Sequence, residues 1–419
     1  MPSPNPLTKF IAACEPGTPA GSEYYVERQQ SRAERLFQAV EPAEKMRALL
    51  VGQTGVGKST ELARVVSATR PDFQAFRIPV DEYLDLDLAT WHDILVLSAC
   101  GLGMHADSRS AHLELAAALQ PRRRTEEKEV IKKQSQSALK SLSSPESVIE
   151  RTKTVVTGGP PEPTPLQRFR NDFRAVHETI ESGRAQYWDL ALSVIAAVKK
   201  TLNKQLILIL DGLEKMTLYG ARRLFGDEGQ FLSKFPCRMI ATAPLALTFD
   251  GSFGQIEENF SYVERLRAVS VDAEGAGERF CRDLLQRRGA SEICSEALLT
   301  RAIGFGAGMP RQLLQVLSYA AKQALGDGLE QISEEALLRA CRRLSEKWQY
   351  QLGPKDYASL EKADEDREPA ERARLLQLGA CVEHDRPEGG LQIDVNPLVE
   401  GLIQRWAAKD AARGGRGGK

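Results

Sequence analysis

The stretch Gly52-Gln53-Thr54-Gly55-Val56-Gly57-Lys58-Ser59 decides how the rest of the sequence is interpreted. It fits the pattern G-x-x-x-x-G-K-[S/T], in which glycines let backbone N–H groups point inward at phosphate oxygens. Residues 47–51 before it are short and apolar, which predicts a buried strand, and residues 58–69 after it predict a helix. A strand, this loop and a helix N-terminus with its positive dipole are typical of a triphosphate-binding loop, or P-loop.

The residues of this loop have expected contacts with a nucleotide. Lys58 is expected to reach the β- and γ-phosphates, and the hydroxyl of Ser59 is expected to ligate Mg²⁺. The predicted nucleotide-binding set is the whole loop with the residue after it: Gly52, Gln53, Thr54, Gly55, Val56, Gly57, Lys58, Ser59 and Thr60.

A second set of candidates follows the aliphatic residues 206–210, which predict a central strand buried on both faces. Asp211 ends this strand and is predicted to hold Mg²⁺, directly or through water. Glu214 is a candidate for polarising the attacking water. Because phosphoryl transfer is catalysed by positioning and by cancelling charge, the set predicts an ATPase that uses Mg²⁺. ATP is favoured over GTP, since residues 203–206 (NKQL) lack the aspartate of a guanine-specific N-K-x-D loop.

The remaining pattern predicts the fold class and the domains. Strand candidates at 73–80, 239–242 and 268–271 alternate with helical patterns, which predicts an α/β fold with a parallel-sheet P-loop core. Later residues are mostly helical, and the end has the helix-helix-strand-turn-strand order of a winged helix. The predicted units are a flexible tail (1–21), a core (22–271) with a mobile insertion (105–165), a helical lid (272–345), a small winged-helix-like α+β domain (346–408) and a basic flexible tail (409–419).

The paired motifs resemble P-loop ATPases of the AAA+ and STAND classes, including their initiator-like and KAP-like branches. The resemblance implies that Tyr25 and Arg28, in the segment Tyr25-Val26-Glu27-Arg28, lie near adenine. It implies that Thr242 occupies the sensor-1 position, where it would contact the γ-phosphate or the water. In Gly308-Met309-Pro310-Arg311, it implies that Arg311 senses the γ-phosphate from the lid. Gly212 departs from AAA+ proteins, which place a glutamate directly after the magnesium-binding aspartate, and slow turnover is therefore expected.

Composition excludes several other classes of protein. The 419 residues are 42% hydrophobic and 27% charged with a net charge of -1, which is typical of a globular protein without a whole-protein basic field. No apolar run is long enough for a membrane helix or a signal peptide, so a cytoplasmic location without a membrane partner is expected. The seven cysteines are scattered and never spaced as C-x-x-C, which favours reduced thiols over a zinc site.

Three functions remain open from the sequence. The first is a regulatory ATPase switch that controls either self-assembly into a homo-oligomer or an effector protein. Bacterial proteins that these motifs resemble often serve in conflict or antiviral defence. The second is a DNA-handling ATPase of the initiator or transposition-regulator kind, and the third is an ATP-bound scaffold that barely hydrolyses. Residues 346–408 hold eight Lys/Arg and thirteen Asp/Glu, which favours protein contacts for that domain. Nucleic acid contact would then come from the insertion or the C-terminal tail.

Overall fold

The computed structural model describes residues 5–14, 20–21, 23–28, 32–68, 70–104, 109–119, 164–271, 275–385 and 390–414. Most of the predicted insertion at 105–165 and the last five residues of the predicted C-terminal tail lie outside these ranges. The described part of the insertion includes α5 (Arg109–Ala118), which packs on α10 (Arg184–Leu202) with Leu115 and Leu119 fully buried.

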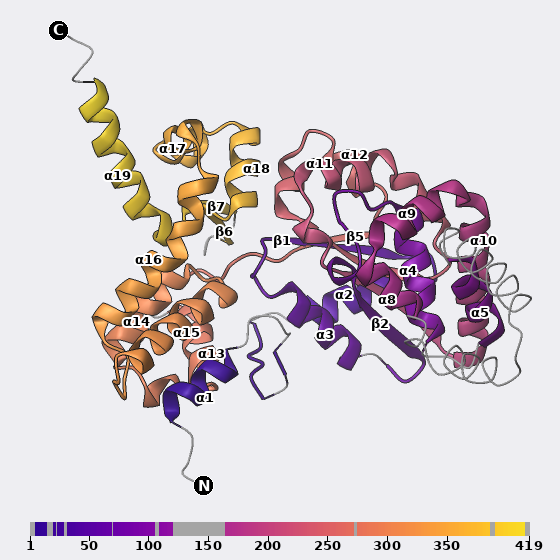
Figure 1. Ribbon diagram of the computed structural model, residues 1–419, viewed down its shortest axis with the longest axis horizontal. Coiled ribbons are helices and arrows are strands. Elements are labelled where there is room, and N and C mark those ends of the chain that lie inside the picture. Colours follow the sequence, from indigo (N-terminus) through magenta and orange to yellow (C-terminus); the bar gives the residue numbers. More distant parts are fainter. Residues whose placement is uncertain are drawn as a thin grey trace, which may run out of the picture.

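The core is a five-stranded parallel sheet in the order β2-β3-β4-β1-β5 (Figure 1). The α/β fold class predicted from the sequence is confirmed. The strands are β1 (Arg47–Gly52), β2 (Phe73–Pro79), β3 (Gln205–Asp211), β4 (Arg238–Pro244) and β5 (Tyr262–Arg265).

Alternate residues of β3 enter two separate apolar cores, as expected for a strand covered on both faces. Leu206, Leu208 and Leu210 face one core, which includes α4 (Trp91–Gly103) and α10. Ile207 and Ile209 face the other core, formed with the helices on either side of β1. The first core also holds α8 (Pro165–Asn171) and α9 (Phe173–Ser182); the second holds α2 (Arg32–Val40) and α3 (Lys58–Ala68).

One strand prediction is wrong. Residues 268–271 do not add a strand to the main sheet; its last strand is β5, and Ala268 makes only an isolated bridge to His384. The β-branched composition of 268–271 resembles a strand, but the chain has already left the sheet there and leads to the lid.

Short turns and helices join the strands: η1 (Val80–Glu82), η2 (Leu213–Lys215), α11 (Leu218–Ala221), a π-helical turn η3 (Arg222–Asp227), η4 (Gly229–Lys234), η5 (Leu245–Phe249) and α12 (Phe253–Glu257).

The helices after the sheet follow the predicted pattern. We call them the lid, after the prediction for residues 272–345, which stays a prediction: α13 (Ala276–Gln286), η6 (Ala290–Glu292), α14 (Glu296–Gly306), α15 (Pro310–Gly326) and α16 (Glu334–Gln351). Pro310 occupies the first turn of α15, where a missing N–H costs nothing. The side chain of Ser333 caps α16 by accepting a hydrogen bond from the amide of Ala336.

The C-terminal unit (354–414) has the predicted order of elements, while its relation to winged helices stays a prediction. Its antiparallel hairpin pairs β6 with β7. The long last helix continues through residues 409–414, so this part of the predicted flexible tail is helical. The elements are α17 (Pro354–Leu360), η7 (Asp364–Asp366), α18 (Pro369–Leu378), β6 (Cys381–Asp385), β7 (Leu391–Val395) and α19 (Pro397–Gly414).

The predicted flexible N-terminal tail contains a packed helix, so the prediction is wrong for residues 6–14. This helix, α1 (Pro6–Ala13), packs against α15 of the lid (Figure 1). Leu7, Phe10 and Cys14 recur at spacings of three and four residues and are all buried. The Pro- and Gly-rich residues around them conceal this short apolar stripe in the sequence.

None of the helices that the structure describes is both long and apolar enough to cross a membrane. All seven cysteines are buried and none forms a disulfide. Burial raises the pKa of Cys100 and of Cys237 to about 12, so both thiols stay protonated near neutral pH.

Candidate nucleotide-binding site

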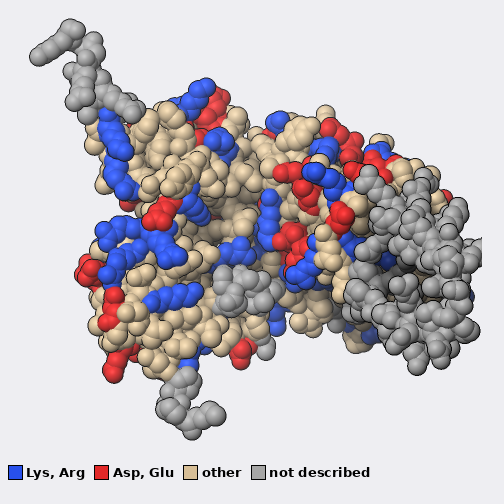
Figure 2. Space-filling model, viewed as in Figure 1, with Lys and Arg blue, Asp and Glu red and all other residues tan. Residues whose placement is uncertain are grey.

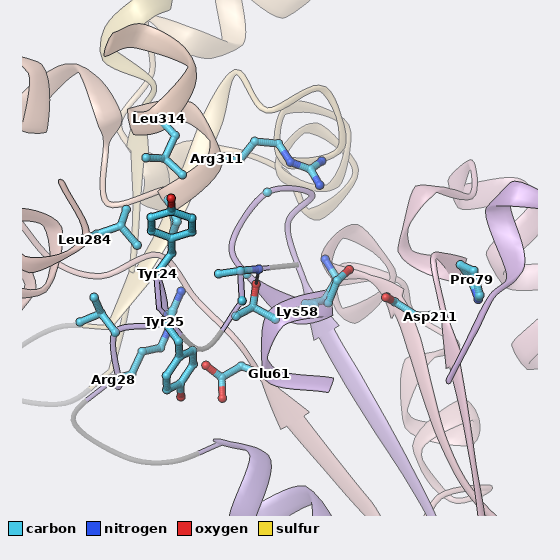
Figure 3. Close-up of a pocket in the computed structure, with 18 of the residues that line it drawn as sticks. Tyr24, Tyr25, Arg28, Lys58, Glu61, Pro79, Asp211, Leu284, Arg311 and Leu314 are labelled. Atoms are coloured by element: carbon cyan, nitrogen blue, oxygen red, sulfur yellow. Dashed lines mark hydrogen bonds between the residues drawn. The ribbon is translucent and has the colours of Figure 1, made fainter. Parts of the chain in front are cut away.

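A cavity of about 500 Å³ opens at the carboxyl edge of the sheet, between the P-loop, the lid and residues 20–21 and 23–28 (Figure 3). Ligands of open α/β sheets bind at this edge. Ten of the residues predicted for the site line it: Tyr25, Arg28, Gly55, Gly57, Lys58, Ser59, Thr60, Asp211, Glu214 and Arg311. Five other predicted residues do not line it: Gly52, Gln53, Thr54, Val56 and Thr242.

The P-loop needs its three glycines for two separate reasons. A Cβ on Gly52 would lie 2.5 Å from the carbonyl oxygen of Leu266, so the position has no room for a side chain. Gly55 and Gly57 have φ angles of +94° and +109°, which L-residues rarely adopt. Val56 between them is fully buried in the core under α3.

Lys58 is fully enclosed at the start of α3. Its ammonium donates hydrogen bonds to the carbonyls of Gly52 (2.7 Å) and Gln53 (2.9 Å) and lies 3.7 Å from Oε1 of Glu214. Burial lowers the pKa of Lys58, and the carboxylates of Glu214 and Asp211 partly offset this effect. The carbonyls of the P-loop thus accept the hydrogen bonds that the Lys58 ammonium would donate to a triphosphate.

Arg28 braces the P-loop from outside. Its guanidinium donates one hydrogen bond to the carbonyl of Val56 and another to that of Arg267 (2.9 Å), and it lies 5.3 Å from the ring centre of Phe280. The ring of Tyr25 packs on the guanidinium of Arg64 at 4.6 Å. Both residues predicted to lie near adenine therefore reach the cavity, but the hydrogen bonds of Arg28 support the loop.

Asp211 lies at the end of β3, where the sequence predicts it, but its carboxylate is paired. Arg77 on the neighbouring strand β2 donates to Oδ2 from Nε at 2.8 Å, and Oδ1 is buried without a partner among the described residues. The hydroxyl of Ser59 and this carboxylate are oxygen donors of the kind that Mg²⁺ prefers, and the unpartnered Oδ1 fits such a ligand. Sequence reasoning missed Arg77, whose only signal is a charge inside an otherwise apolar strand.

Glu214 reaches the P-loop because the chain turns sharply after Asp211. Gly212 has φ of +98°, and a Cβ there would lie 2.0 Å from Oδ1 of Asp81. Glycine is thus required directly after Asp211, and the turn η2 returns Glu214 towards Lys58. Burial alone would raise the pKa of Glu214, but the ammonium of Lys58 and a hydrogen bond from Thr242 outweigh it, so the pKa is lowered.

Thr242 and Arg311 approach the site from opposite sides. Thr242 is fully buried in β4 behind Glu214 and contacts that carboxylate instead of the cavity. Thr242 does not line the cavity, and the contact with the γ-phosphate or the water that the resemblance implies for it stays a prediction. Arg311 lies directly on the P-loop, with its backbone N–H donating to the carbonyl of Gly55 at 3.2 Å. Figure 3 shows its side chain extending over the loop.

The other end of the cavity is apolar. Tyr24 projects between Leu284 and Leu314 of the lid (Figure 3), next to the wall that α1 supplies. Arg288 holds this end together by donating to the carbonyls of Ala13 (3.1 Å) and Tyr24 (3.2 Å). A charged end around the P-loop and an aromatic and aliphatic end suit the phosphates and the base of one nucleotide.

Replacing Arg77 with methionine removes the partner of Asp211 and nearly preserves side-chain volume. We expect the nucleotide-free variant to be less stable by about 1–3 kcal/mol, because a buried carboxylate loses its hydrogen bonds. We expect ATP with Mg²⁺ to raise its Tm more than that of the wild type, because Mg²⁺ no longer competes with a guanidinium. Thermal unfolding with and without ATP and Mg²⁺ measures both effects, with Arg70→Met, an exposed arginine just before β2, as the control. Equal ligand-induced shifts in all three proteins would contradict this role.

Comparison with known proteins gives structural similarities at low identity. No protein-family model matches the sequence, and no curated protein matches it either. The ORC2 protein of Aeropyrum pernix, solved as ADPNP–ADP complexes, is 13% identical over 91% of this chain and 95% of its own, with a TM-score of 0.42. Cdc6p of Pyrobaculum aerophilum is 13% identical over 93% and 98% (TM-score 0.35).

The RuvB Holliday junction branch migration motor of Thermotoga maritima is 12% identical over 91% of this chain and 99% of its own (TM-score 0.36). At these identities and scores, none of the similarities carries an argument about activity, partners or residue roles. The functional interpretation therefore depends on the site itself.

Proposed function

We propose that this protein is an ATP-binding switch that hydrolyses ATP slowly and whose lid and C-terminal unit respond to the nucleotide. The observation that carries the proposal is the meeting of Lys58, Asp211, Glu214 and Arg311 around one P-loop, at the charged end of a cavity with an apolar opposite end. These four groups come from the start of α3, the end of β3, the turn η2 and the start of α15.

Each residue would have a defined task. The phosphates would take the donors of Lys58 from the carbonyls of Gly52 and Gln53, and Arg311 would cancel charge from the lid side. Ser59 and Asp211 would hold Mg²⁺, which when bound draws negative charge from the β- and γ-phosphates.

Glu214 would orient and polarise the attacking water. Its lowered pKa keeps it ionised at neutral pH, so it can accept a hydrogen bond from that water. Because Glu214 is buried against Lys58, it would have to leave this pair before it can act on water, which supports slow turnover.

The C-terminal unit is better suited to protein contacts than to reading DNA. Two arginines of α18, which could otherwise present positive charge to DNA, are neutralised inside the unit: Arg374 by Asp356 (2.9 Å) and Arg372 by Asp364 (3.3 Å). The same helix packs against η5 of the core, which a DNA duplex would have to displace. We therefore favour control of self-assembly or of an effector protein. A role in bacterial conflict or antiviral defence is a hypothesis that rests on the resemblance of the motifs.

Calorimetric titration of the purified protein with ATP and with GTP, each with Mg²⁺, tests the proposed site. We expect ATP to bind at least tenfold more tightly than GTP, with slow release of phosphate. Light scattering with a non-hydrolysable ATP analogue then tests assembly. Absence of nucleotide binding would refute the proposal, while salt-sensitive binding of a DNA duplex, without assembly, would favour the DNA-handling alternative.

A further inference from the structure

The side chain of Gln53, the second residue of the P-loop, points away from the nucleotide cavity and into the C-terminal unit. Its Nε2 donates to the carbonyls of Cys381 (2.7 Å) and Leu376 (3.2 Å), and its Oε1 accepts from the amide of Glu383 (3.1 Å). The side chain is buried and more than 320 residues away in sequence from these partners. One amide group thus satisfies backbone groups at the end of α18 and along β6.

Other contacts hold β6 in the same place. The amide of Ala268 donates to the carbonyl of Glu383 at 3.0 Å, and the guanidinium of Arg267 lies 3.4 Å from the fully buried carboxylate of Glu383. The carbonyl of Arg267 accepts a hydrogen bond from Arg28, and Arg28 supports the P-loop. The β6 strand is therefore joined to the P-loop directly through Gln53 and indirectly through Arg28.

The main chain of Gln53 belongs to the phosphate site. Its carbonyl accepts a hydrogen bond from the ammonium of Lys58 at 2.9 Å. A triphosphate that takes Lys58 removes this bond and allows the peptide of Gln53 to reorient. The same residue therefore has one contact that responds to phosphate and three that hold the C-terminal unit.

We propose that Gln53 is a positioning residue that couples nucleotide occupancy to the C-terminal hairpin. This inference rests on the proposed function, because it requires a triphosphate at Lys58. Nucleotide binding loosens the three bonds of the Gln53 side chain and releases β6, and a partner that draws β6 away shifts the P-loop towards its nucleotide-bound arrangement. The two effects are reciprocal, since a coupling free energy acts equally in both directions.

Two further contacts extend the coupling to the rest of the site. Gln377 of α18 donates to the carbonyl of Met216, just beyond the turn that carries Glu214, at 2.9 Å. Gln312 of α15 and Asn396, between β7 and α19, exchange hydrogen bonds of 3.0 and 2.9 Å. The C-terminal unit is thereby joined to the P-loop, to the acidic turn and to the lid, the three elements that surround the phosphates.

Hydrogen exchange of residues 381–384 in the full chain, with and without an ATP analogue and Mg²⁺, tests the coupling. In the wild type we expect the analogue to accelerate exchange there at least fivefold. In Gln53→Met, which keeps the side-chain length and removes the hydrogen bonds, we expect fast exchange without nucleotide and no further effect of the analogue. The control is Gln392→Met on β7, an exposed glutamine whose amide bonds only Asp394 and which should behave as the wild type.

The outcomes separate the two proposals. If the wild type binds the analogue and exchange at 381–384 stays unchanged, or if Gln53→Met responds as the wild type does, the coupling is refuted while the site stands. If the wild type binds no nucleotide, the proposed function itself fails. Should Gln53→Met not fold, Gln53→Glu takes its place; it keeps the acceptor for Glu383 and loses both donors, so we expect partial loss of coupling.

Discussion

Lys58→Met is expected to weaken ATP·Mg²⁺ binding at least 100-fold, which corresponds to about 3 kcal/mol. The substitution removes a charged donor from an enclosed site, where charge-assisted hydrogen bonds contribute about 1.5–3 kcal/mol each. The ammonium is fully buried, so water does not replace it at the phosphates. Titration calorimetry of the variant measures the loss directly.

A stability control accompanies this variant, because Lys58 also neutralises Glu214. Removing one partner of a buried pair is strongly destabilising, by about 3–5 kcal/mol, unless the carboxyl takes up a proton. The double variant Lys58→Met/Glu214→Gln leaves no unpaired charge and should recover most of the stability while still failing to bind ATP. Wild-type affinity in either variant would show that the nucleotide does not use this loop.

Glu214→Gln is expected to reduce kcat by about 100-fold or more and to leave ATP affinity within threefold. Glutamine has the size of glutamate but cannot take a proton from water, and a positioned base contributes about 10²- to 10⁴-fold. Because the pKa of Glu214 is lowered, its basic form persists as the pH falls through the usual glutamate range. The wild-type kcat/KM should therefore decline only below that range.

Steady-state phosphate release measures kcat and calorimetry measures ATP affinity, so the two together separate a loss of rate from a loss of binding. The matched control is Glu258→Gln, an exposed carboxylate beside α12, away from the cavity, which should keep the wild-type rate. An unchanged kcat in Glu214→Gln would assign water activation to another group. A parallel loss of affinity would mean that Glu214 holds the loop and does not act as a base.

The parts of the structure predicted from the sequence are those with strong local signals. The aliphatic run at 206–210 and the glycine pattern at 52–57 define β3 and the P-loop without information from the rest of the chain. The place of Asp211 and Glu214 at the site could be predicted because the carboxyl ends of parallel strands share one edge of the sheet. The sequence predicts that both carboxylates lie near Lys58, but it does not predict their distances from the ammonium.

The features that could not be predicted depend on contacts between distant segments. Arg77 is an ordinary charge until the pairing of β2 with β3 places it beside Asp211. The sequence predicts Gln53 only as part of the nucleotide-binding loop, and its role towards the C-terminal unit becomes visible once β6 is packed against it. The helix α1 has too few residues to be recognised alone, and its stripe is explained only by the lid surface that it covers.

The packing of α1 on α15 has a mechanical consequence. A helix from the start of the sequence thereby covers its apolar stripe with a helix that follows the sheet. Any displacement of α15 therefore either carries α1 along or exposes Leu7, Phe10 and Cys14 to water, which adds a hydrophobic cost to separating the two helices.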